Sequence, residues 1–187
     1  SFDTITIVGE GSTSSTAYFP VNFSYGLKEF SYSQQIYTSD EIGADMNGKY
    51  LTHISFEKAR GSQNYKRSVV VYIENTDKTQ FNGDYDWLPM TSEPVFSGNV
   101  SWGYDSGYVT IKLDTPFKYT GNNIVISVHD ATGEKNYIAT GFDKFTTYTA
   151  GNNRTIYTST KLDPKTGLAD NGYAGQGTRS TSNNKIQ

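Results

Sequence analysis

Three carboxylates near the start of the chain could bind a cation. The run 31–43 reads SYSQQIYTSDEIG and contains Asp40 and Glu41 near its end, and Asp45 follows two residues after it. Calcium takes six to eight oxygen ligands, and loops at the rim of a β-sandwich can provide carboxylates of this kind. The spacing matches no EF-hand loop, so the sequence leaves calcium binding as one of two interpretations.

The other interpretation is structural. Residues 38–41 fit the T-x-x-E pattern of a helix capping box, in which Thr38 accepts from the amide of Glu41 and the Glu41 carboxylate reaches back. Gly43 can then adopt a positive φ angle and end the turn. Gln34 shares a strand face with Ile36, which predicts a buried amide that hydrogen-bonds a backbone group.

Two short stretches interleave aromatic residues with acids and could bind a ligand. They read DYDW at 84–87 and WGYD at 102–105. Aromatic faces can stack on sugar rings while carboxylates bond the hydroxyls, and Tyr and Trp are equally frequent at protein interfaces. Either tryptophan could instead be a core residue, whereas flanking Gly and Asp favour exposure of the two tyrosines. The candidate ligand-binding residues are Tyr85, Trp102, Tyr104 and Asp105.

Catalytic patterns are weak. The two histidines, His53 and His129, lie mid-strand opposite larger apolar residues, which predicts exposure to solvent, and no G-x-S-x-G elbow occurs. A glycosidase needs only two carboxylates at a suitable separation, and Glu57 and Glu74 could face each other across a groove. We nevertheless expect a protein without catalytic activity.

Composition argues against several other classes. The chain has no cysteine, so disulfides and thiolate zinc sites are excluded. A net charge of -3 with scattered basic residues argues against nucleic-acid binding. No apolar run approaches the roughly 20 residues that span a bilayer. Because the chain begins at Ser1 without a signal-type segment, we expect a processed product or part of a longer protein.

Alternation of apolar and polar residues with a period of two recurs along the chain, together with many Tyr, Phe, Thr and Gly residues. It predicts an all-β, two-sheet β-sandwich of jelly-roll type with eight to ten strands, forming a single domain over residues 1–187. A long polar loop is expected near 158–184, with a last strand at 184–187. The predicted strands cover 4–7, 30–37, 50–57, 67–74, 108–113, 123–130 and 136–142, with short pieces at 86–88 and 94–96.

Several of these segments also resemble a known module. SYSQQIYTSDEIG at 31–43, VVVYIENTDKTQF at 69–81, PVFSG at 94–98 and LDTPFKYTGNN at 113–123 occur in a characteristic order. They resemble secreted and surface modules of Bacteroidetes-type bacteria, similar to the adhesin (haemagglutinin) domains of gingipain-like proteins. The resemblance covers about residues 4 to 130 and implies a non-catalytic β-sandwich within a longer surface chain.

The sequence therefore predicts a secreted or cell-surface adhesion module that recognises a glycan or a host or matrix protein. The alternative is a structural spacer that holds neighbouring domains of a larger surface protein or enzyme. A glycoside hydrolase is the third hypothesis.

Overall fold

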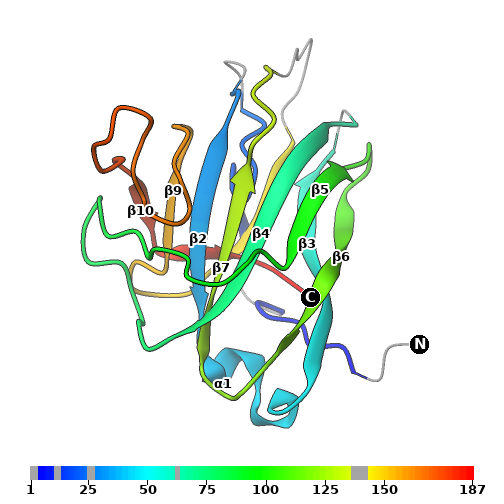
Figure 1. Ribbon diagram of the computed structural model, residues 1–187. Coiled ribbons are helices and arrows are strands. Elements are labelled where there is room, and N and C mark those ends of the chain that lie inside the picture. The colour runs from blue at the N-terminus through cyan, green and yellow to red at the C-terminus, as the bar shows by residue number, and fades with distance from the viewer. Residues whose placement is uncertain (1–3, 11–13, 25–27, 62–63, 136–142) are drawn as a thin grey trace.

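Two antiparallel β-sheets face each other in the computed structural model, which describes residues 4–10, 14–24, 28–61, 64–135 and 143–187 (Figure 1). One sheet has five strands, which are β1 (Ser14–Ala17), β8 (Lys144–Thr149), β3 (Tyr50–Arg60), β6 (Gly107–Lys118) and β11 (Ser182–Asn184). The other has six, in the order β10 (Thr178–Ser180), β9 (Thr155–Thr158), β2 (Ser31–Tyr37), β7 (Asn123–Asp130), β4 (Lys66–Thr76) and β5 (Phe96–Ser101).

The chain changes sheet at most of its connections, as in a jelly roll, and the predicted all-β sandwich is confirmed. The described residues form eleven strands rather than eight to ten, because β1, β9, β10 and β11 are too short to show an alternating pattern. The predicted strand at 4–7 is wrong, since only Val8 forms a bridge there, to Ile186. The strand predicted at 136–142 lies outside the described residues.

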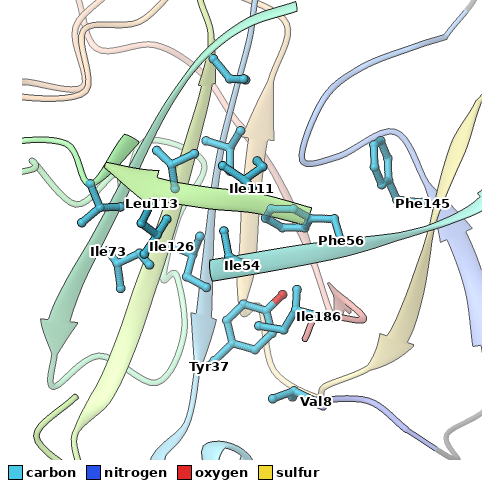
Figure 2. Packing of buried hydrophobic residues seen from close by; sticks show 14 of the residues in the cluster. Val8, Tyr37, Ile54, Phe56, Ile73, Ile111, Leu113, Ile126, Phe145 and Ile186 are labelled. Carbon is cyan, nitrogen blue, oxygen red and sulfur yellow. The ribbon is translucent and has the colours of Figure 1, made fainter. Parts of the chain in front are cut away.

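The main core lies between the sheets, where alternate strand residues face one another. Phe56 on β3 and Ile126 on β7 are almost fully buried within it, and Figure 2 shows their neighbours Ile54 and Ile111 converging on the same space. Burying each such side chain contributes about 1.5–3 kcal/mol. The two sheets are therefore held together mainly by apolar contact.

The six-stranded sheet is also buried on its outer face. The segment 77–95 between β4 and β5 crosses in front of β2 and β7 (Figure 1), and its Trp87 stacks on Tyr32 with ring centroids 5.1 Å apart. Gln34 on the same face bonds both backbone groups of Leu88, at 2.6 Å and 2.8 Å, as the sequence predicted for a buried amide. The sheet thus supports a second layer made of loops.

The C-terminal residues complete the five-stranded sheet. The amide of Lys185 donates to the carbonyl of Thr146 (3.0 Å), and the amide of Ser55 donates to the carbonyl of Gln187 (2.8 Å). Residues 182–187 therefore lie between β8 and β3, which agrees with the predicted return of a last strand. The predicted polar loop at 158–184 is only partly a loop, because it contains all of β10 and β11 and buries Leu162.

Candidate functional site

Two loops meet over the β10 edge of the six-stranded sheet. The indole N–H of Trp87 donates to the carbonyl of Gly175 (2.8 Å), and the amide of Gly177 donates to the carbonyl of Asp84 (2.6 Å). A Cβ atom at position 177 would lie 2.8 Å from the Trp87 ring, so a glycine is needed for this close approach. The buried tryptophan thus fixes residues 84–87 against residues 175–177.

A polar hollow of about 290 Å³ opens where these loops meet. Arg179 on β10 donates from Nε to Asp84 Oδ1 at 3.1 Å, and both side chains are partly exposed. Carboxylate, guanidinium, amide and hydroxyl groups together offer both donors and acceptors to a ligand. The residues lining this polar hollow are Asp84, Asn153, Gln176, Gly177, Thr178 and Arg179.

An exposed aromatic residue is adjacent in the chain to Asp84, which lines the polar hollow. Tyr85 follows Asp84 in the chain and is 59% exposed, in agreement with the exposure predicted from its neighbours. Asp86 on its other side turns away from the hollow to accept from Lys78 Nζ (2.7 Å) and the amide of Asn82 (2.8 Å). Burial raises the pKa of Asp86, but these bonds outweigh it and hold that pKa below its ordinary value.

The other predicted ligand-binding residues lie elsewhere. Trp102 is only 1% exposed and packs edge-on against Phe145 at 5.3 Å, so its ring is a core element and offers no face to a ligand. Tyr104 is 65% exposed and Asp105 is also exposed, but both follow β5 at the opposite edge of the sheet. Five strand spacings of about 4.8 Å separate β10 from β5, so Tyr85 and Tyr104 cannot share one small ligand.

The structure does not group the three candidate metal ligands, Asp40, Glu41 and Asp45, around one position in the described part of the chain. Glu41 completes the predicted capping box with Thr38 and also binds Arg154 with both oxygens, at 2.6 Å and 2.8 Å. Asp40 and Asp45 are exposed on the surface nearby. Within the described ranges, no group of three or more His, Cys, Asp or Glu side chains is placed to hold a metal ion. The structure therefore offers no support for the calcium interpretation.

Glu41 is instead the centre of a buried polar cluster. Besides Arg154 and Thr38, its carboxylate accepts a short hydrogen bond from the Tyr148 hydroxyl. Burial alone would raise the pKa of Glu41, but the bonds from Arg154, Thr38 and Tyr148 hold it below its ordinary value. The T-x-x-E motif is therefore structural in this chain.

The histidine prediction is wrong for one of the two residues. His129 is buried against Tyr32, with ring centroids 5.8 Å apart, because residues 77–95 and 159–177 cover that face of the sheet. Burial lowers the pKa of His129. His53 is half-buried, and its Nδ1 lies 2.8 Å from the Thr52 hydroxyl.

The proposed pair of glycosidase carboxylates is not assembled. Glu57 binds Lys185 (2.9 Å) on the five-stranded sheet, whereas Glu74 accepts from the amides of Thr91 (2.9 Å) and Ser92 (3.1 Å) on the six-stranded sheet. Both alternate with core residues and so point away from the space between the sheets. Two carboxylates on opposite outer faces cannot act on one glycosidic bond.

Two other hollows occur on the surface of the described residues. One of about 130 Å³ lies between the N-terminal segment and β3 and is lined by Tyr50 and His53 among others. A second, of about 310 Å³, lies between the β1 and β10 edges and is lined by Ser and Thr hydroxyls with Tyr18 and Tyr157. Neither brings a carboxylate and a guanidinium together, as the polar hollow does.

Sequence reasoning missed most of the polar hollow. Arg179, Gln176 and Asn153 lie far from Asp84 in the chain and are brought to it by the pairing of β9 with β10. No spacing rule links them, because their contact depends on a three-residue strand within a polar segment. The only local signal was the DYDW stretch itself.

Searches against protein-family models, curated proteins and solved structures found no match to the chain. The class that the structure itself defines is a two-sheet antiparallel β-sandwich. The resemblance to adhesin modules stays a prediction. No helix in the described part of the chain is long and apolar enough to cross a membrane.

Proposed function

We propose that this protein is a non-catalytic binding module of a secreted or cell-surface protein and that it holds a carbohydrate in the polar hollow. The observation that carries the proposal is the half-exposed Arg179–Asp84 pair in the polar hollow, with the exposed Tyr85 next to Asp84 in the chain. Sugar hydroxyls both donate and accept, and the lining side chains supply both partners. The resemblance to surface adhesin modules supports the assignment to the cell surface.

The arrangement suits reversible binding. The hollow is lined by residues from three loops and β10, and two of these loops are fixed to each other by Trp87 and by the amide of Gly177. A site whose groups are already held in place loses less conformational entropy when a ligand binds. Tyr85 would cover the apolar face of a sugar ring while Arg179 and Asp84 bond its hydroxyls.

Binding of the intact domain to an array of oligosaccharides and matrix proteins tests this proposal. We expect a glycan to bind and Tyr85→Ala to weaken that binding about threefold to tenfold, as loss of an aromatic contact does. Tyr104→Ala is the matched control, because it removes a similarly exposed tyrosine from the opposite edge of the sheet. Tyr50→Ala tests whether the glycan binds instead in the hollow beside β3, which Tyr50 lines.

Each result has a distinct meaning. Glycan binding that Tyr85→Ala weakens and Tyr104→Ala leaves unchanged supports the proposed site. Binding of a matrix protein instead of a glycan would replace the ligand class, since Tyr and Arg are also frequent interface hot spots. If the folded domain binds nothing on either array, the proposal fails and the structural spacer is the better hypothesis.

A further inference from the structure

A fully buried lysine–aspartate pair joins two adjacent strands of the five-stranded sheet. Lys58 Nζ on β3 lies 2.8 Å from Asp143 Oδ2, and neither side chain is exposed to solvent. Asp143 directly precedes β8, whose Phe145 pairs with Lys58 in the strand register. Two residues far apart in the sequence are thus held in contact by the sheet itself.

Aromatic side chains surround this pair. Phe23 stacks on Tyr65 with centroids 4.5 Å apart, and Trp102 packs edge-on against Phe145 at 5.3 Å. Phe23 also lies 6.1 Å from Trp102, so the rings form one continuous cluster. The amine and the carboxyl group are thus enclosed by apolar side chains and shielded from water.

The hydrogen bonds of the amine orient it toward the carboxyl group. Lys58 Nζ donates to the carbonyls of Trp102 (3.1 Å) and Gly103 (2.7 Å), and its third direction points to Asp143. Transfer of the third proton to the carboxylate leaves a neutral amine that still donates two N–H bonds. The amine then lies beside the carboxylic acid, with Nζ 2.8 Å from Oδ2, so the two reacting groups are already held together.

We propose that Lys58 and Asp143 join in an intramolecular amide bond. The amine Nζ attacks Asp143 Cγ, the new N–C bond forms, and one C–O bond of the acid breaks. The leaving hydroxyl takes a proton from the nitrogen and departs as water. The step is a condensation, so it needs no oxidant, reductant or further reactant.

One buried donor near Asp143, the Tyr65 hydroxyl, can stabilise the negative charge that develops on the acid oxygen. This hydroxyl has no hydrogen-bond partner among the described residues, although Tyr65 is more than nine-tenths buried. Burial raises the pKa of Tyr65, and the nearby Asp143 carboxylate raises it further, so the phenol stays protonated and can donate. Donors placed at a developing oxyanion accelerate acyl transfer.

Intact-mass spectrometry of the purified wild-type protein tests the bond directly. We expect a mass lower than that of the sequence by one water molecule. Tandem spectra of a tryptic digest should show the peptide that contains Lys58 joined to the peptide that contains Asp143. A full sequence mass would overturn the proposal, as would a water loss confined to a single peptide, which indicates a cyclic imide.

Two variants sharpen the result. Asp143→Asn should lose ammonia instead of water, because the same amide forms, so its final mass should equal that of the cross-linked wild type. Lys58→Arg keeps a cation at the site but provides no amine of the same reactivity, and it should retain its full sequence mass. If Lys58→Arg also lost water, the bond would lie elsewhere. The wild-type mass decides the question even if a variant does not fold.

Discussion

Two arginine–carboxylate pairs involve the paired strands β9 and β10, with Arg154 directly before β9 and Arg179 on β10, and they differ in depth and geometry. Arg154 binds Glu41 with two bonds of 2.6 Å and 2.8 Å, and the two side chains are 7% and 20% exposed. Arg179 binds Asp84 through one bond of 3.1 Å, and those side chains are 31% and 43% exposed. These two pairs therefore place the same chemical groups at two depths, largely buried at Arg154 and partly exposed at Arg179.

The difference separates a structural role from a binding role. The interior pair is bidentate, and its carboxylate also accepts from Thr38 and Tyr148, so its hydrogen-bonding capacity is used within the fold. The surface pair makes a weaker contact beside a hollow and remains accessible to a ligand. Depth and bond geometry, rather than residue type, thus distinguish the two pairs.

The largest effect should come from breaking the interior pair. Arg154→Met leaves the Glu41 carboxylate without its main partner in a largely buried position, and removal of one member of a buried pair typically costs about 3–5 kcal/mol. We expect the free energy of unfolding in urea to fall by that amount. Arg179→Met is the matched control at the surface pair. A loss below about 1 kcal/mol for Arg154→Met would contradict the structural assignment.

A smaller loss should follow from crowding the loop junction. A Cβ atom at position 177 would lie 2.6 Å from Ile156 and 2.8 Å from Trp87, so Gly177→Ala forces the loop away from the sheet. Overpacking of this kind costs about 1–3 kcal/mol, and we expect weaker ligand binding as well because Gly177 lines the polar hollow.

Gly83→Ala is the control for that change, since nothing lies within 4 Å of its added methyl group. Urea unfolding gives the stability of both variants, and titration with the glycan identified on the array gives their affinities. Equal stability of the two variants would show that the junction at residue 177 is not tightly packed.

The Arg154–Glu41 pair should also make the free energy of unfolding depend on pH. Because the folded state lowers the pKa of Glu41, the unfolded state binds the proton at a higher pH than the folded state. The stabilisation is complete above the ordinary glutamate value of about 4.3 and is lost as the pH falls from there through the lower folded pKa. The free energy of unfolding, measured between neutral and acid pH, should converge for wild type and Glu41→Gln as the pH falls. Parallel curves would argue against this role.

The fold class could be predicted from the sequence because the alternation of apolar and polar residues with a period of two is visible within each strand. The capping box at Thr38 and Glu41 and the buried amide of Gln34 were likewise confirmed, since each depends on residues within one strand end or one turn. Trp102 and His129 were placed less well because their burial depends on distant segments: the aromatic cluster in one case and the covering loops in the other.

Contacts between remote segments could not be predicted from one sequence. The polar hollow needs β10 to bring Arg179 to Asp84, and the Lys58–Asp143 pair needs β8 to lie beside β3. Each depends on which strands pair, and the alternating pattern does not carry that information. Local motifs therefore gave the elements, whereas the candidate sites arise from the topology.

The smallest effect on stability, and the largest on binding, should come from the surface pair. Arg179→Ala removes one half-exposed ion pair, which contributes at most about 1 kcal/mol to folding. Loss of a charged hydrogen bond to a ligand typically costs about 1.5–3 kcal/mol, so we expect glycan affinity to fall about tenfold or more while the urea midpoint hardly moves.

Asp84→Asn, which keeps the shape of the side chain but removes its charge, should weaken glycan binding without unfolding the loops. The reason is that the Gly177 amide bonds the Asp84 backbone carbonyl rather than its side chain. If both variants lose stability and binding in parallel, the surface pair supports the loops in the way that Arg154 supports the core, and the contrast between the two pairs disappears.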